Sequence, residues 1–166
     1  MDVFDVPSDV SHETQKHLRC NGARHEEGVV LWRGTFTPPR ITALIVPEQE
    51  TSTGRFRVPL AERQRITRKL AGTGEVIVAQ VHSHPNWAFH SSIDDEEAIP
   101  RRVGAYSLVI PDFGARDHLL DGAALFQLDA HGVWQPAPLD IFRLPRSESR
   151  LKWLIDTLKS FGRLRT

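Results

Sequence analysis

The sequence predicts an α+β fold in which a mixed β-sheet is flanked by helices. Val76–Val81 is an uninterrupted β run rich in β-branched residues, and its composition is typical of a strand buried on both faces. Ser8–Asn21 has a polar start and an Asn-Gly stop, the signals of a helix. At 166 residues the chain is long enough to bury a substantial core, and we expect residues 1–166 to form a single domain.

The first half of the chain is predicted from local patterns. β-branched and aromatic residues indicate strands at Gly28–Trp32 and Arg40–Val46, and prolines between them fit a connection. The polar stretch Glu48–Arg57 is interpreted as a short loop. Pro59 is tolerated in the first turn of a helix, whose apolar residues recur at helical spacing as far as Leu70.

The second half continues this alternation of strands and helices. After this strand a loop leads to a short helix at Ile93–Ile99. Further strands are predicted at Tyr106–Ile110 and in a late hairpin formed by Asp121–Leu128 and Val133–Trp134. Apolar residues at helical spacing predict a C-terminal amphipathic helix at about 147–163.

Composition excludes several classes of function. Lysine and arginine balance aspartate and glutamate, so bulk charge does not favour nucleic acid as a partner. Cys20 is the one cysteine, which rules out an internal disulfide and fits a reducing compartment. The N-terminus lacks the pattern of a signal peptide, and no apolar stretch approaches the length of a membrane span. We therefore expect a cytoplasmic protein without a membrane partner.

Residues 80–97 contain the most informative pattern of the chain. His82 and His84 follow the buried strand, and alternation along a strand places both imidazoles on one face. Asp95 follows His84 after ten intervening residues and falls in the first turn of the next predicted helix. Two imidazoles and one carboxylate are a ligand set of catalytic zinc, which keeps its fourth position for water. The sequence therefore predicts a metal hydrolase with His82, His84 and Asp95 as ligands.

Hydrolysis of an amide also needs a general base and a donor to the developing oxyanion. Ser92, one helical turn before Asp95, is the candidate donor, and the base must be a carboxylate from elsewhere. The neighbouring acidic residues Asp94, Glu96 and Glu97 are interpreted as a solvated helix start. The sequence leaves open the roles of Trp87, Phe89 and His90, which lie in the loop between the ligands.

The stretch His82-Ser83-His84-Pro85, followed by Ser92 and Asp95, resembles the metalloprotease signature of the MPN domain, the JAB or JAMM proteins. This resemblance implies that the base is a glutamate seven residues before the final glycine of an apolar run. Glu27 stands seven residues before Gly34. The resemblance also implies one catalytic Zn²⁺ and a curved mixed sheet of the MPN type, related to the cytidine-deaminase architecture.

The short loops make the chain similar to compact bacterial members of that family. By this resemblance we expect a zinc-dependent isopeptidase, deubiquitinase-like in its chemistry. It would hydrolyse the bond after the C-terminal tail of a ubiquitin-like protein, in deconjugation or in precursor processing. Activating and conjugating enzymes of the E1 and E2 kinds would be further partners. One alternative is release of an amino acid such as cysteine from a sulfur-carrier protein. Another is a non-catalytic scaffold that binds partners through its MPN domain.

Overall fold

The computed structural model describes residues 3–145. It contains three α-helices, namely α1 (Ser8–Gly22), α2 (Leu60–Leu70) and α3 (Ser92–Glu97), and two short 3₁₀ turns. The strands are β1 (Phe4–Asp5), β2 (Val29–Phe36), β3 (Pro39–Ile45), β4 (Glu50–Ser52), β5 (Arg55–Arg57), β6 (Val76–Ser83), β7 (Tyr106–Ile110), β8 (Ala124–Leu128), β9 (Trp134–Ala137) and β10 (Phe142–Arg143). The C-terminal helix predicted at about 147–163 lies outside the described residues.

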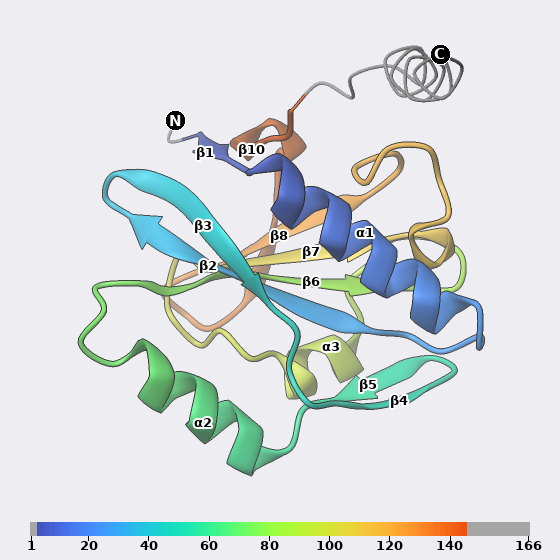
Figure 1. Ribbon diagram of the computed structural model, residues 1–166, viewed down its shortest axis with the longest axis horizontal. Helices are drawn as coiled ribbons and strands as arrows, with labels where there is room; N and C mark the ends of the chain where they lie inside the picture. The colour runs from blue at the N-terminus through green and yellow to red at the C-terminus, as the bar shows by residue number, and fades with distance from the viewer. Residues whose placement is uncertain (1–2, 146–166) are drawn as a thin grey trace, which may run out of the picture.

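Eight of these strands form one mixed sheet in the order β10-β1-β3-β2-β6-β7-β8-β9, and β4 and β5 form a separate hairpin (Figure 1). The pair β6–β7 is parallel, whereas β2–β6 and β7–β8 are antiparallel. The curled mixed sheet and its helices confirm the α+β prediction. Within residues 3–145 no helix combines the length and the apolarity that crossing a membrane requires.

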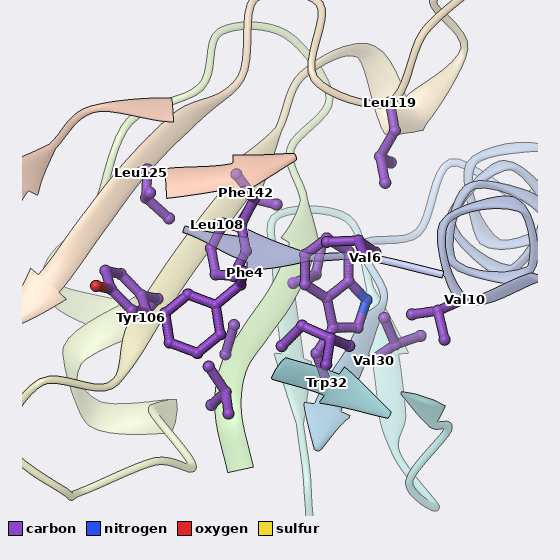
Figure 2. Close-up of a cluster of buried hydrophobic side chains, with 14 of the residues drawn as sticks. Phe4, Val6, Val10, Val30, Trp32, Tyr106, Leu108, Leu119, Leu125 and Phe142 are labelled. Atoms are coloured by element: carbon purple, nitrogen blue, oxygen red, sulfur yellow. The ribbon is translucent and has the colours of Figure 1, made fainter. Parts of the chain in front are cut away.

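The two faces of the sheet carry different layers. Helix α1 crosses one face, and α2, α3 and the β4–β5 hairpin gather on the other (Figure 1). Alternation along β2 explains this division, because Val30 and Trp32 pack with the core on the α1 side while Val29 and Leu31 pack with α2 and β5. Figure 2 shows the core on the α1 side, where Trp32 lies among aliphatic side chains. There the buried Trp32 Nε1 donates to Thr14 Oγ1 of α1 at 2.9 Å.

The structure corrects the prediction at three places. Residues 48–57, predicted as a loop, contain the β4–β5 hairpin, whose Phe56 is buried while Arg55 and Arg57 point outward. The short strands β1 and β10 had no local signal, because each is two residues long and forms through pairing with distant segments: β1 pairs with β10 and β3. The strand predicted at Gly28–Trp32 runs from Val29 to Phe36. Three-dimensional pairing decides all three outcomes.

Candidate metal centre

Strand β6 delivers the two histidines on a rigid backbone. His82 lies in the register opposite Val29 of β2 and Val109 of β7, so the sheet holds it from both sides. The chain beyond it stays fixed, because the His84 amide donates to the Ile110 carbonyl at 2.9 Å. Both imidazoles are buried, and they face the side of the sheet that carries α3 and the hairpin. The two imidazoles lie on one face of the sheet, as alternation along the strand predicts.

The carboxylate that joins them comes from Asp94. Its Oδ1 lies 3.1 Å from His82 Nε2, and its Oδ2 lies 3.5 Å from His84 Nε2. One ligand atom from each of the three residues lies within 4.8 Å of the others. Two ligands at zinc–nitrogen or zinc–oxygen distance and at the tetrahedral angle are separated by about 3.4 Å. The measured spacings therefore suit a single small cation.

The unpaired ring nitrogens of the buried His82 also support a metal site at this position. His82 is fully buried, and neither ring nitrogen has an aligned hydrogen-bond partner within the described residues. Its Nε2 is near Asp94 without meeting the angular requirement of a hydrogen bond, as expected of ligand atoms aimed at a common point. A buried polar group without a partner is costly, and a coordinated metal ion would remove that cost. The residues present fit a bound metal.

Asp95, predicted as the third ligand, points elsewhere. Its side chain is 59% exposed, and its Oδ1 lies 3.3 Å from His90 Nδ1. Consecutive residues on a helix are turned by about 100°, so only one of Asp94 and Asp95 can face the histidines. Ser92, predicted as the hydroxyl donor, is exposed at the start of α3. Asp94, predicted to be solvated, is buried at the centre.

Ser91 takes the place beside the carboxylate that the prediction gave to Ser92. Its backbone amide and hydroxyl donate to Asp94 Oδ2 at 2.7 and 2.8 Å, and its hydroxyl oxygen accepts from the Asp94 amide at 3.2 Å. This reciprocal capping box fixes the first turn of α3. Burial disfavours a charged Asp94, but the two imidazoles and the Ser91 amide outweigh it and hold the Asp94 pKa far below its usual range.

Glu27 is buried next to these ligands. Continuing the β2–β6 register by two residues beyond Val29 and His82 places Glu27 opposite His84. Burial raises the pKa of Glu27 to about 7; the nearby His84 opposes this rise and Asp94 adds to it. For His84, burial lowers the pKa, but Asp94 and Glu27 more than compensate and raise it. Glu27 is thus a carboxylate that can gain and lose a proton near neutrality.

The loop between the ligands contains the three residues left without a role. The His90 side chain is only 7% exposed, and its ring lies 5.0 Å from the Phe126 ring and 5.3 Å from the Trp134 ring. Phe89 is exposed, with its ring 4.7 Å from that of His84, and Trp87 is 79% exposed. His90 therefore anchors the loop to β8 and β9, whereas the other two aromatic rings remain on the surface.

Known proteins resemble this chain in sequence and in fold. No family model matches the chain. A relative named probable metalloprotease y4jG, from Sinorhizobium fredii, is 34% identical over 139 residues, which cover 80% of this chain and 86% of the relative.

Two solved structures share the fold. Protein DSY2949 from Desulfitobacterium hafniense superposes with a TM-score of 0.59 at 16% identity, over 86% of this chain and 93% of its own. A protein from Salinibacter ruber superposes with a TM-score of 0.53 at 18% identity, over 89% of this chain and 94% of its own. At these identities the two structures support the fold alone. The sequence identity and coverage of the Sinorhizobium protein show more: the chain belongs to the family of the probable metalloprotease y4jG.

Proposed function

We propose that this protein is a zinc-dependent peptidase of the JAMM type. The observation that carries the proposal is the buried group His82, His84 and Asp94 with the buried carboxyl of Glu27 beside it. The relationship of this chain to a probable metalloprotease supports the same chemistry. A non-catalytic scaffold would have no need to keep two buried imidazoles and two buried carboxylates around one point, because burying such groups is costly.

Each residue has a distinct task in this proposal. His82, His84 and Asp94 would hold zinc, which would supply Lewis-acid chemistry and lower the pKa of water at this site to about 7. Glu27 accepts a proton from the attacking water and passes it to the leaving amine, for which a pKa near neutrality is well suited. Ser91 positions the Asp94 carboxylate, because its amide and its single hydroxyl proton are both donated to Asp94 Oδ2.

The proposed substrate is the C-terminal tail of a ubiquitin-like protein, joined through an isopeptide or peptide bond. This step rests on the resemblance of the histidine-rich segment to the JAMM signature, with the third ligand moved from Asp95 to Asp94. The proposed partners are therefore a ubiquitin-like protein and the enzymes that activate and conjugate it. Release of an amino acid from a sulfur-carrier protein uses the same bond chemistry and is tested beside it.

The test is incubation of the zinc-loaded protein with ubiquitin-like fusions and with carrier–amino acid adducts, with and without a chelator. We expect chelator-sensitive cleavage after the tail of a fusion. Glu27→Gln should keep zinc bound and lower kcat by at least about 100-fold, because a general base contributes that much. Glu13→Gln, at a half-exposed glutamate of α1 that pairs with Lys16, is the control and should remain active.

Three outcomes would contradict the proposal. Activity that persists after removal of the metal would exclude the zinc mechanism. Normal rates in Glu27→Gln would exclude Glu27 as the base. Cleavage of carrier–amino acid adducts alone would retain the mechanism and replace the substrate.

A further inference from the structure

The helix that carries Asp94 is too short to hold its own position. Helix α3 has six residues, and isolated helices below about 12 residues are marginal in water. Tertiary contacts must therefore place Asp94 against the histidines. At its start, the Ser91 cap provides one such contact, and just beyond its end the Ile99 amide donates to Gln80 Oε1 of β6 at 3.0 Å.

Glu97 provides a further contact. It lies three residues after Asp94, on the same buried side of α3, and its side chain is only 7% exposed. Its Oε1 accepts from Arg55 Nη2 of β5 at 2.7 Å, and its Oε2 accepts from Arg63 Nη2 of α2 at 2.8 Å. Arg63 is itself fixed, because its Nε donates to the Val58 carbonyl at 2.8 Å. A buried carboxylate held by two guanidinium groups is a directional connection, and losing one partner removes one of its two charge-assisted hydrogen bonds.

The β4–β5 hairpin that supplies Arg55 also touches the segment around Glu27. The Glu27 amide donates to the Ser52 carbonyl at 3.0 Å. Thr51 Oγ1 donates to Glu26 Oε2 at 2.7 Å, and Thr53 Oγ1 donates to the His25 carbonyl at 2.9 Å. One small hairpin thus contacts the backbone of the proposed base and, through Arg55, the helix that carries the acidic ligand (Figure 1).

The interior of the hairpin also meets the metal site. Phe56, between the two outward arginines, is buried, and its ring lies 5.2 Å from the His82 ring. Strand β5 therefore contacts His82 through Phe56, and it pairs through Arg55 with α3, the helix that carries Asp94. Such outer contacts orient metal ligands, and their loss typically lowers metal affinity by about 10- to 100-fold.

We propose that Arg55 and Glu97 are positioning residues, and that the β4–β5 hairpin acts as a strut that sets Asp94 at the metal centre and Glu27 beside it. Neither residue touches the reacting atoms. The catalytic part of this inference rests on the proposed peptidase function, whereas the part concerning metal affinity does not. Residues 48–57 therefore belong to the working site, although the sequence predicts them as a plain loop.

The test compares Arg55→Gln with Arg57→Gln. Both replace an arginine of β5, but within residues 3–145 the Arg57 side chain forms an ion pair only with the exposed Glu50, at 3.6 Å. Zinc affinity is measured by competition with a chromogenic chelator, and folding is followed by thermal unfolding of the metal-free proteins. We expect Arg55→Gln to bind zinc about tenfold more weakly. Arg57→Gln should match the wild type. In the fusion assay, kcat of Arg55→Gln should fall about tenfold while KM stays unchanged.

Two further variants keep the test decisive. Arg55→Lys retains the positive charge and should recover most of the zinc affinity, which a purely steric role would not predict. Glu97→Gln should lower zinc affinity as Arg55→Gln does, and it replaces that variant should the latter not fold. Equal zinc affinity in Arg55→Gln and Arg57→Gln, whatever their stability, would overturn the inference. If the wild type binds zinc and cleaves no substrate, the proposed function fails. The comparison of zinc affinities still tests the positioning role of the β4–β5 hairpin.

Discussion

At neutral pH and above, Glu27 should lower the free energy of unfolding of the metal-free protein, even though it is proposed to be essential for turnover. Its pKa rises from an ordinary value of 4.5 to about 7 in the folded protein, mainly because burial disfavours the charged form. Between these values the unfolded chain releases a proton that the folded protein retains. The stability contributed by the neutral carboxyl is therefore complete below pH 4.5 and is lost as the pH rises to about 7.

The magnitude follows from the size of the shift. One pKa unit corresponds to about 1.4 kcal/mol, so the wild type should lose about 3 kcal/mol across this range. Glu27→Gln removes the ionisation and keeps the shape. The free energy of unfolding of the variant, relative to that of the wild type, should therefore rise by about 1.4 kcal/mol per pH unit and then level off. At pH 8 this is a higher Tm by roughly 6–12 °C for a chain of this size.

The assay is chemical denaturation of both proteins at several pH values in the presence of a chelator. Glu26→Gln provides a control of opposite sign, because hydrogen bonds from Thr51 and Arg24 lower the pKa of Glu26. Neutralising Glu26 should therefore cost stability above its ordinary pKa. Saturating zinc should shrink the Glu27 effect, since a nearby cation favours the carboxylate. A difference between Glu27→Gln and the wild type that does not change from pH 4.5 to pH 8 would refute this reasoning.

Three other predictions concern the metal and the core. Asp94→Asn should weaken zinc binding by more than about 100-fold, since a ligand matters more than an outer partner, whereas Asp95→Asn should leave it unchanged in the same chelator competition. Zinc at 100 times its Kd should raise the free energy of unfolding of the wild type by about 2.7 kcal/mol, and Asp94→Asn should show no such gain in thermal unfolding. Thr14→Val should cost about 1–3 kcal/mol in urea denaturation, because the buried Trp32 indole N–H loses its acceptor. This loss of stability should not depend on pH, since neither the Thr14 hydroxyl nor the Trp32 indole titrates near neutrality.

Part of the site follows from local sequence. The apolar run before His82 predicts a buried strand, and the period of two predicts that both imidazoles share a face. These properties depend on neighbouring residues only. The placement of Glu27 required a resemblance to a known motif, and the structure buries that residue near His84.

The capping pattern in the local sequence was not enough to assign the third ligand. Ser91-Ser92 and Asp94-Asp95 are doubled, so the Ser-x-x-Asp capping pattern fits the chain in two registers one residue apart. Asp94 is buried and Asp95 is exposed, and the capping pattern does not distinguish them. A useful signal is Glu97, which shares a helix face with Asp94 and not with Asp95.

The sequence by itself determined the kind of chemistry, because residue types and their spacing along a rigid strand decide which ligand atoms can converge. Tertiary structure alone decided which aspartate converges with the histidines, and it turned residues 48–57 from a loop into a hairpin that connects Arg55 with Glu97. The physical reason is distance along the chain. A strand orients its side chains through bonds between neighbours, whereas the rotation of a six-residue helix is set by contacts with residues some 40 positions away.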